Sequence, residues 1–416
     1  MTASLPPTEW MADPRTMAVM DALEAAGGAG CARFVGGCVR NTLMDRPVED
    51  IDIATVLDPR AVTQALKAAR LRAVPTGIAH GTVTAISGRR PYEITTLRRD
   101  VETDGRHAVV AFTDDWREDA ARRDFTVNAL YADRDGTVLD PTGEGVADAV
   151  AGRIVFVGEP EARIGEDHLR ILRFFRFHAW YGRGEADAAA LAACAALKDQ
   201  TASLAAERVS KELLKLLAAE DPRPAVELMA QAGVLAVVAP AATDLGRFAS
   251  LVEIESGQLF EGDALLRLAA LLPDDPAVGL ATAGRLRLAN AQRDRLALAL
   301  VPDPDLKSGM SPKEVRRAVY RVGAAAFRDR VKLAWAGARG TAATPEWRGL
   351  IALAEGWNPP AFPLTGEDAM AAGLPKGPQV GQALREVEGW WIDQDFPDDR
   401  AAAIGKLKAV AQGMGR

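Results

Sequence analysis

The chain has 416 residues, of which 48% are hydrophobic and 26% charged, the composition of an ordinary globular protein long enough for several domains. A net charge of −7 argues against a protein that is basic over its whole surface, although a local basic groove for phosphates stays compatible with it. No apolar run approaches the roughly 20 residues that span a bilayer. The first residues, MTASLPPTEWMADPR, show no features of a secretory signal.

Cysteine and histidine are both scarce in this sequence. The three cysteines, Cys31, Cys38 and Cys194, have no Cys-x-x-Cys spacing, and we therefore expect a reducing, cytoplasmic location. All four histidines lie within the first 180 residues. The rest of the chain therefore cannot hold a histidine-based metal centre.

Two kinds of pattern follow one another along the chain. Short β-branched runs, punctuated by glycine and aspartate, predict strands over 32–35, 50–54, 82–86 and 91–97. Beyond residue 155, apolar residues return at three- and four-residue steps and predict long helices, for example over 166–182, 206–219 and 223–235. Prolines predict breaks between helices at 302–304 and 358–360. The predicted fold class is α+β, with an α/β head followed by a mostly helical body.

The densest chemistry lies in 34–55, FVGGCVRNTLMDRPVEDIDIAT, where a short apolar strand ends at Gly36 and Gly37 and helix-compatible residues follow. Paired glycines let backbone N–H groups approach a phosphate closely, at a helix N-terminus whose dipole favours anions. Arg40 adds a guanidinium suited to phosphate oxygens. A simple tight turn is the alternative interpretation.

The same segment carries a pair of acids. Strand alternation places Asp50 and Asp52 on one face and Ile51 and Ile53 on the other. Neighbouring carboxylates repel each other unless a cation lies between them, and hard divalent cations suit carboxylate and phosphate oxygens. Glu93 becomes a third acid of the site if its side chain points inward, which the sequence does not fix. The alternative is an exposed strand edge with solvated acids.

The paired glycines, Arg40 and the Asp-x-Asp strand together resemble the nucleotidyltransferase superfamily that includes DNA polymerase beta. This resemblance implies two-metal phosphoryl transfer, with Mg²⁺ as the cofactor held by Asp50 and Asp52. The segments RRDFTVNAL (122–130) and RIGEDHLRILRFFRF (163–177) narrow it to the class II tRNA nucleotidyltransferases (CCA-adding enzymes) and the bacterial poly(A) polymerases related to them. The matching motifs span about residues 33–217.

The family resemblance also implies an organisation in four parts. We expect a catalytic head over 1–155, a helical neck with a base-reading motif over 156–220, a helical body over 221–302 and a helical RNA-binding tail over 303–416. The polar stretch from Arg98 to His107 corresponds to a mobile loop of this family, and its composition fits a flexible segment.

Roles for individual residues follow from the same resemblance. The incoming nucleotide is expected to contact Arg123, Asp124 and Asn128. Arg173 and Arg176 continue the row from Arg170 at three-residue steps, toward the triphosphate or the RNA end. A structural role is expected for the remaining motif residues: an Arg–Asp pair for Arg122, core packing for Phe174, Phe175 and Phe177, and bracing of the site for Glu207, Arg208 and Glu212.

Asp167 and Arg170 permit a physical argument about base selection. Three residues apart on a helix, they share a face. Cytosine and adenine both offer an exocyclic amine donor beside a ring-nitrogen acceptor, which match a carboxylate and a guanidinium. Uracil and guanine reverse both groups, so one fixed pair accepts CTP and ATP and rejects UTP and GTP. The resemblance assigns the pair this same role. The alternative is an intrahelical ion pair of a few tenths of a kcal/mol.

Two later segments suggest RNA contacts. Residues 311–339 carry eight Lys or Arg against two acids, an excess that could follow an RNA backbone, although solvated helix faces look similar. Residues 364–384 resemble a tail motif of the family, with a Gly377-Pro378-x-x-Gly381 turn ahead of a helix.

The sequence thus predicts a transferase that extends the 3′ end of tRNA to CCA from CTP and ATP and releases pyrophosphate. A poly(A) polymerase, or an enzyme that adds only C or only A, would share every motif quoted. A catalytically inactive RNA-binding protein is the more distant alternative. Oligomeric state, tRNA preference and the termination of addition stay open at this level.

Overall fold

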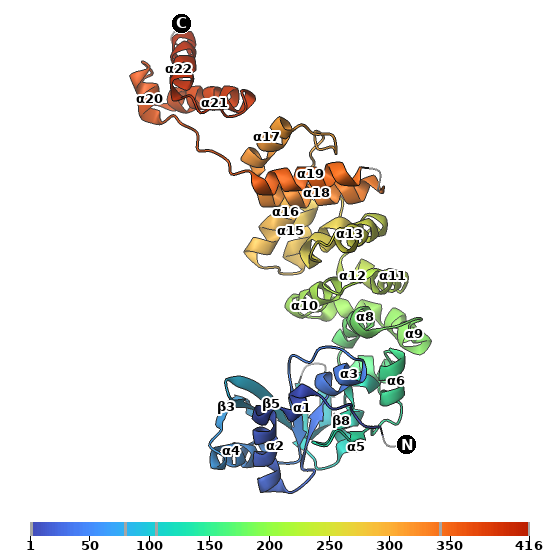
Figure 1. Cartoon of the computed structure of the whole chain (residues 1–416). Coiled ribbons are helices and arrows are strands. Elements are labelled where there is room, and N and C mark those ends of the chain that lie inside the picture. Colours follow the sequence, from blue (N-terminus) through green and yellow to red (C-terminus); the bar gives the residue numbers. More distant parts are fainter. Residues whose placement is uncertain (1–2, 79–80, 105–106, 341–342, 415–416) are drawn as a thin grey trace. The chain divides into compact units, whose positions relative to one another are not determined.

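The computed structural model describes residues 3–78, 81–104, 107–340 and 343–414. The chain forms two compact units, Met1–Pro240 and Ala241–Arg416. Figure 1 shows the helices and strands of both units, coloured along the sequence.

The first unit contains a mixed seven-stranded sheet in the order β3-β4-β5-β2-β1-β8-β9. Its central pair, β2 and β5, is parallel, and the other neighbours are antiparallel. The strands are β1 (Ala32–Val35), β2 (Asp52–Thr55), β3 (Arg72–Gly77), β4 (Thr82–Ser87), β5 (Arg90–Thr96), β8 (Tyr131–Ala132) and β9 (Val138–Leu139). All four strands predicted from the sequence exist, and they form the contiguous centre β4-β5-β2-β1.

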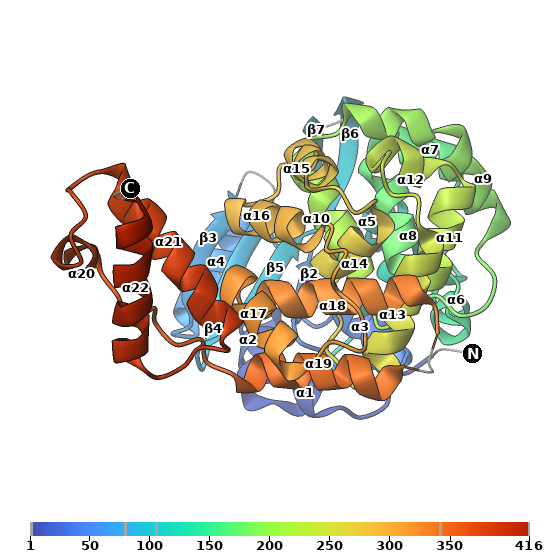
Figure 2. The same cartoon turned by 90° about the horizontal axis from the view of Figure 1, so that it is seen from above.

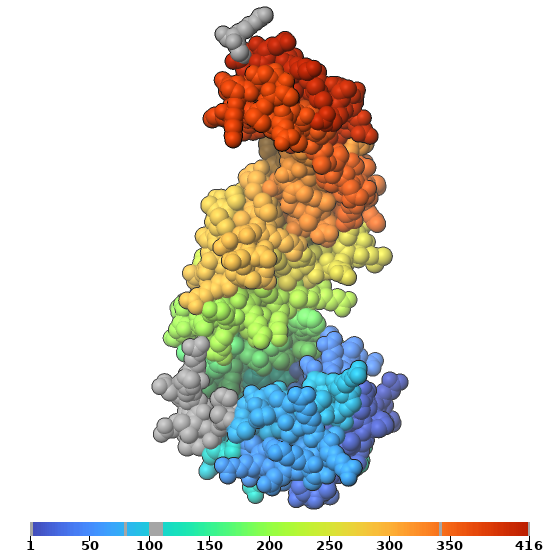
Figure 3. Space-filling view, turned by 90° about the vertical axis from the view of Figure 1, so that its left-hand side faces the viewer, coloured from blue at the N-terminus to red at the C-terminus, as the bar shows by residue number. Residues whose placement is uncertain are grey.

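The edges of the sheet were harder to predict. β3 is an edge strand without a buried side chain, on the blue surface in Figure 3. The polar stretch expected to be a flexible loop forms strand β6 (Arg98–Asp104) and the start of β7 (His107–Phe112), which pair as a separate two-stranded sheet. Residues 105 and 106 within that stretch lie outside the described residues. Backbone pairing satisfies N–H and C=O groups whatever the side chains, so polar composition did not reveal this hairpin.

Helices pack around the sheet of the first unit. α2 and α4 contact each other and strand β4, while a 3₁₀ turn at Thr126–Asn128 follows α5 and precedes β8. The helices in this part are α1 (Glu9–Ala12), α2 (Pro14–Gly27), α3 (Gly37–Leu43), α4 (Pro59–Ala68), α5 (Trp116–Ala121) and α6 (Gly145–Ala151).

The rest of the first unit is helical. It contains α7 (Pro160–Glu166), α8 (Leu169–Tyr181), α9 (Ala188–Ala196), a 3₁₀ segment (Lys198–Ser203), α10 (Ala206–Leu217), α11 (Arg223–Gln231) and α12 (Val234–Val238). Phe174, Phe175 and Phe177 on α8 are buried, which confirms their predicted core role.

Two predicted helices are interrupted. The helix expected over 166–182 breaks at Asp167, whose backbone is extended (φ −152°, ψ 104°), and α8 begins two residues later. The Asp167 carboxylate accepts a hydrogen bond from the backbone N–H of Leu169 and so starts the new helix. The helix expected over 223–235 stops before Gly233, whose φ of +74° favours glycine. Hydrophobic periodicity continues across such breaks and does not reveal them.

The second unit is helical throughout its described part. Its helices are α13 (Leu245–Gly257), α14 (Ala264–Leu271), α15 (Pro276–Arg285), α16 (Asn290–Ala299), α17 (Pro312–Val322), α18 (Ala324–Ala338), α19 (Thr344–Gly356), α20 (Gly366–Ala371), α21 (Pro378–Asp393) and α22 (Arg400–Met414). Both predicted breaks fall between helices, after α16 and after α19. α18 and α19 run side by side in Figures 1 and 2.

Two separate hydrophobic clusters stabilise the later helices. One joins α17, α18 and α19 around the buried Trp335, and the other joins α20, α21 and α22 around Leu407. None of the helices in the described ranges is long and apolar enough to cross a membrane.

The buried position of Phe174 makes its contribution to stability testable. Phe174→Ala removes a ring that is 0% exposed, and we expect the free energy of unfolding to fall by about 3–5 kcal/mol. Val150→Ala, at a side chain that is 61% exposed, is the control and should shift stability by less than about 0.5 kcal/mol. Urea denaturation followed by circular dichroism measures both, and equal effects would contradict the assigned core.

Candidate active site

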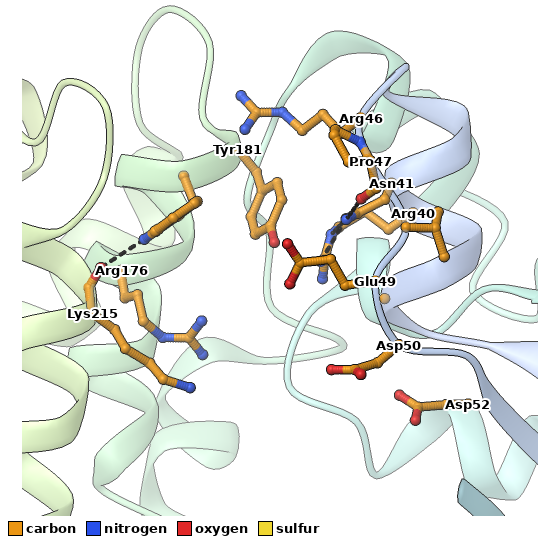
Figure 4. Close-up of a pocket in the computed structure, with 13 residues that line it drawn as sticks. Arg40, Asn41, Arg46, Pro47, Glu49, Asp50, Asp52, Arg176, Tyr181 and Lys215 are labelled. Carbon is orange, nitrogen blue, oxygen red and sulfur yellow. Dashed lines mark hydrogen bonds between the residues drawn. The ribbon is translucent and has the colours of Figure 1, made fainter. Parts of the chain in front are cut away.

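A pocket of about 560 Å³ lies in the first unit beside the start of strand β2 (Figure 4). Helix α3 and the segment before β2 form one wall, and helices α8 and α10 form the other. Its lining residues are Gly37, Arg40, Asn41, Arg46, Pro47, Val48, Glu49, Asp50, Asp52, Arg176, Trp180, Tyr181 and Lys215. Acids from one wall therefore share the pocket with cations from both.

The predicted acid pair lies in this pocket. β2 begins at Asp52, so Asp50 precedes the strand instead of belonging to it, yet the side chains of both acids point to the same side in Figure 4. Ile51 and Ile53 are buried at 2% and 0% exposure, as the alternation predicted. The apolar contacts of these two isoleucines fix the register that turns the aspartates outward.

Glu93 lies directly opposite Asp52 across the parallel pair of β2 and β5. Register partners in a sheet share a face, and Tyr92 and Ile94 on the opposite face are fully buried. Burial, together with the charges of Glu93 and Asp50, raises the pKa of Asp52 to about 6. Asp50, Asp52 and Glu93 thus lie near one another on the central strands of the sheet.

The predicted phosphate turn is a tight turn whose backbone conformation requires glycine. Gly36 caps the N-terminus of α3 with φ +67° and ψ −116°, a conformation that side chains rarely adopt. Arg40, on the same helix, is only 6% exposed. Its Nη1–H donates to the Asn128 side-chain oxygen at 2.5 Å, and its Nε–H and Nη2–H donate to Asn41. The turn and the 124–128 segment are thereby joined.

Arg123 and Arg122 share one buried carboxylate, Asp119. Arg123 pairs with it at 3.0 Å and donates to the Asn128 backbone oxygen, while Arg122 makes the Arg–Asp pair that the sequence predicted. Burial raises the pKa of Asp119, but Arg123 and Arg122 outweigh it and lower that pKa to about 2. Arg123 therefore supports the turn at Gly36 from behind, close enough that a Cβ at Gly36 would lie 3.6 Å from it.

Asp124 connects the head to helix α8. Its carboxylate accepts hydrogen bonds from the Asn128 side chain at 2.9 Å and from Arg173 of α8. Burial alone would raise the pKa of Asp124, yet Arg173 and these hydrogen bonds hold it below its ordinary value. Of the predicted nucleotide contacts, Asp124, Asn128 and Arg173 thus form one network with Arg40.

Asp167 and Arg170 do not pair with each other. The break at Asp167 means that they do not share a helical face as expected, which also excludes the intrahelical ion pair. The Asp167 carboxylate pairs with Arg208 of α10 at 2.7 Å, and Arg170 pairs with Glu166 at 2.5 Å. Neither of the two lines the pocket in Figure 4, whereas Arg176 does and pairs with the buried Glu212 at 2.5 Å. Arg208 and Glu212 therefore brace these residues as predicted.

Comparison with known proteins identifies the family. Residues 32–155 match the model described as Poly A polymerase head domain, and 187–245 match Probable RNA and SrmB-binding site of polymerase A. The mouse mitochondrial CCA tRNA nucleotidyltransferase 1 is 32% identical over 391 residues, which cover 90% of this chain and 86% of that protein. The CCA-adding enzyme of Latilactobacillus sakei is 30% identical, covering 94% and 96%. The chain belongs to the CCA-adding enzyme family.

Solved members of the family share the fold. The Bacillus stearothermophilus CCA-adding enzyme in complex with CTP has a TM-score of 0.74 at 23% identity, covering 97% of this chain and 99% of that one. The Thermotoga maritima CCA-adding enzyme complexed with tRNA has a TM-score of 0.68 at 18% identity, covering 99% and 100%. These matches confirm the predicted α+β class with a nucleotidyltransferase head.

Sequence reasoning missed several residues that line the pocket of this family member. Glu49 and Arg46 come from the segment before β2, and Trp180, Tyr181 and Lys215 come from the ends of α8 and α10. The Trp180 indole N–H donates to the Lys215 carbonyl at 2.7 Å and joins the two helices. A usable signal existed for Lys215, because it follows Glu212 by three residues and so shares its helix face.

The basic segment 311–339 has fewer unpaired positive charges for contact with RNA than its composition suggested. Arg316 and Arg317 on α17 pair with Asp395 and Asp393, and Arg339 pairs with Asp244. The others in contact are Arg328, which pairs with Glu355, Arg330, which is buried, and Lys332, which is buried against the Phe260 ring. Lys313 and Arg321 remain exposed. Much of the counted excess therefore stabilises the second unit.

The tail motif at 364–384 comprises α20 and the first part of α21. Gly377 is the N-cap and Pro378 the first residue of α21, so the predicted turn is the first turn of that helix.

Metal binding by protein side chains alone is not indicated. Among the residues that the structure describes, no group of three or more His, Cys, Asp or Glu side chains is arranged to hold an ion. Asp50 and Asp52 therefore offer part of a coordination sphere, which fits an ion that takes its other ligands from water and substrate phosphates.

The raised pKa of Asp52 predicts a pH-dependent effect of Asp52→Asn on stability. The folded protein keeps a proton on Asp52 up to about pH 6, whereas the unfolded chain releases it near the ordinary aspartate pKa of 3.8, so stability falls as the pH rises through this window. In EDTA at pH 8, Asp52→Asn should raise the free energy of unfolding by about 1–2 kcal/mol. This is less than the free energy that corresponds to the whole pKa shift, because Asp52 is partly exposed and solvent screens its charge.

The control for this effect is the same pair of proteins at low pH. Near pH 4 the wild-type carboxyl is itself protonated in the folded state, and the gain should disappear. Urea titrations at both pH values measure it. A gain of equal size at pH 4 and pH 8 would show that desolvation and charge repulsion at Asp52 are not its cause.

Proposed function

We propose that this protein adds CMP and AMP, without a template, to the 3′ end of tRNA and releases pyrophosphate from CTP and ATP. The observation that carries the proposal is the pair of acids Asp50 and Asp52 in a pocket that Arg40, Arg176 and Lys215 also line, with Glu93 opposite Asp52 on the neighbouring strand. Near full-length similarity to CCA tRNA nucleotidyltransferases supports the substrates, as do structures of family members titled as complexes with CTP, ATP and tRNA.

Mg²⁺ is the proposed cofactor, and the residues present fit it. Asp50 and Asp52 are crowded with Glu93 and carry a raised pKa at Asp52, a cost that a divalent cation would remove. Asp50 and Asp52 would hold the ion, and Glu93 is the candidate third acid. When bound, Mg²⁺ would lower the pKa of the attacking hydroxyl and neutralise the departing pyrophosphate.

The chain's own residues would hold the triphosphate and the attacking end. The RNA 3′ oxygen forms a bond to the α-phosphorus while the bond to the pyrophosphate oxygen breaks. Gly36, Gly37 and Arg40 are proposed to bind the phosphates. Gly37 lines the pocket in the first turn of α3, where backbone N–H groups have no partner within the helix, and Arg40 still has unused donors. The Gly36 N–H donates to the Leu130 carbonyl, so Gly36 would contribute through the shape of the turn. We propose that Arg123, Asp124 and Asn128 hold the sugar and triphosphate through the network around Gly36, and that Arg173 and Arg176 complete the basic side.

Base selection is proposed for Asp167 and Arg170. Arg208 pairs with the Asp167 carboxylate, while Glu166 and the carbonyls of Arg163 and Arg122 hold the Arg170 guanidinium. An acceptor and a donor would thus be fixed independently of each other. An acceptor and a donor that meet the same base would match the shared edge of cytosine and adenine and repel uracil and guanine. This arrangement replaces the single helical face that the sequence suggested.

We also propose the four-part organisation of head (1–155), neck (156–220), body (221–302) and RNA-binding tail (303–416). A cytoplasmic location is proposed because Cys31, Cys38 and Cys194 are free, buried thiols.

Incubation with tRNA that lacks CCA tests the proposed activity. With CTP and ATP together we expect three added nucleotides, with CTP alone two, and no product with UTP or GTP, resolved on sequencing gels. Long A tracts from ATP alone would identify a poly(A) polymerase instead. Incorporation of only C, or of only A, when CTP and ATP are both present would identify an enzyme that adds a single kind of nucleotide. RNA binding without incorporation would favour the inactive RNA-binding alternative.

Replacement of the acids tests the metal-dependent step. Asp50→Asn with Asp52→Asn should lower incorporation by at least about 10³-fold, because no carboxylate remains to hold the cation. Binding of tRNA in a filter assay should stay within about twofold. Since loss of these charges removes repulsion, reduced stability would not account for the loss of activity. Retained activity in the double variant would contradict the metal assignment.

The base-reading proposal predicts relaxed specificity. Asp167→Ala leaves Arg170 in place and should raise incorporation of UTP and GTP relative to CTP by about 10–100-fold, the range for one lost discriminating contact. Arg208→Met, which removes only the partner of Asp167, should give a smaller change in the same direction. Ratios of kcat/KM for the four nucleotides measure the effect. Unchanged ratios in both variants would refute the role of Asp167.

A further inference from the structure

Arg40 is an unusual buried cation. It is 6% exposed, and within the described ranges no carboxylate lies at ion-pair distance from it. Its guanidinium donates hydrogen bonds to the neutral side-chain amide oxygens of Asn41 and Asn128. A charge removed from water without an opposite charge costs free energy unless another interaction offsets that cost.

Aromatic rings, together with the charge of Asp124, supply that interaction. The carbon at the centre of the Arg40 guanidinium lies 3.9 Å from the centroid of the Tyr181 ring and 5.2 Å from that of Phe177. Both rings belong to α8, and Tyr181 is its last residue, where the helix dipole also favours cations. Figure 4 shows Tyr181 and Arg40 together in the pocket.

This mode of holding leaves Arg40 free for a phosphate. A ring attracts a guanidinium through its face, whereas the N–H groups point outward in the guanidinium plane. Three of the five N–H groups donate to Asn41 and Asn128, which leaves two. A carboxylate in place of the ring would occupy those donors and neutralise the charge, and phosphate oxygens would then compete with it.

We propose that Tyr181 is a positioning residue for nucleotide binding: its ring stacks on Arg40 and presents the remaining guanidinium donors to the triphosphate. The proposal rests on the proposed function of Arg40. Tyr181 acts through Arg40 and does not contact the base. Its effect is therefore the same for CTP and ATP, which share the triphosphate.

Tyr181→Leu removes the ring and keeps an apolar side chain at the end of α8. We expect KM for CTP and for ATP to rise by about 3–20-fold and by the same factor, with kcat within about twofold. Inhibition by inorganic tripolyphosphate should weaken by a similar factor. Tyr181→Phe retains the ring and should restore all three values.

A matched control and a double variant separate this role from general loss of stability. Phe260→Leu removes the ring beneath Lys332 in the second unit, 4.2 Å from its ammonium nitrogen, and should leave both KM values unchanged. In an Arg40→Gln background, Tyr181→Leu should add no further rise in KM. An equal additional rise there would overturn the proposal, as would unchanged KM in Tyr181→Leu alone. A change in KM for only one nucleotide would assign Tyr181 to base contact instead.

Calorimetric titration with tripolyphosphate distinguishes a failure of the proposed role of Tyr181 from a failure of the proposed reaction. Wild-type protein that binds tripolyphosphate more tightly than Tyr181→Leu, yet incorporates no nucleotide, would support the stacking role and contradict the proposed reaction. Incorporation by the wild type with equal tripolyphosphate affinity in both proteins would contradict the stacking role alone.

Discussion

Repulsion among carboxylates on two central strands of the sheet is the constraint around which the first unit is organised. The parallel pairing of β2 with β5 places Asp52 opposite Glu93, and Asp50 precedes the strand on the same side. Burial and these charges raise the pKa of Asp52, so the apoprotein holds this arrangement at a cost in free energy. The isoleucines between the acids maintain it, because any slip of one residue would expose them.

The positive side of the pocket is built on a different principle. Its arginines are fixed by partners of graded strength: buried carboxylates hold Arg123 and Arg176, while amides and aromatic rings hold Arg40. An arginine with a carboxylate partner is a rigid support, because its charge is already balanced. An arginine held by neutral groups retains its charge for a substrate. The proposed nucleotide site thus combines arginines whose charge a carboxylate already balances, such as Arg123 and Arg176, with Arg40, whose charge no carboxylate in contact among the described residues balances.

Helix α8 connects these two sides. Arg173 reaches Asp124 of the head, Arg176 reaches Glu212 of α10, and Tyr181 reaches Arg40 of α3. Three consecutive turns of one helix thereby fix the acid-bearing head, the nucleotide network and the opposite wall relative to one another. The buried side chains of Phe174, Phe175 and Phe177 hold α8 in place. A change in the packing of α8 is therefore expected to affect all three of these parts.

The sequence by itself determined the central strands, the side of β2 that carries the acids, the buried face of α8 and the family. These features depend on periodicity and on motifs within a few residues. The geometry of a strand or helix determines directly on which face such neighbouring side chains lie. Only the tertiary structure decided that Glu93 faces Asp52, that Asp167 leaves the helix for Arg208, and that Tyr181 lines the pocket. Each of these depends on the register or packing of segments about 40 to 140 residues apart, and such contacts leave no periodic pattern in the sequence.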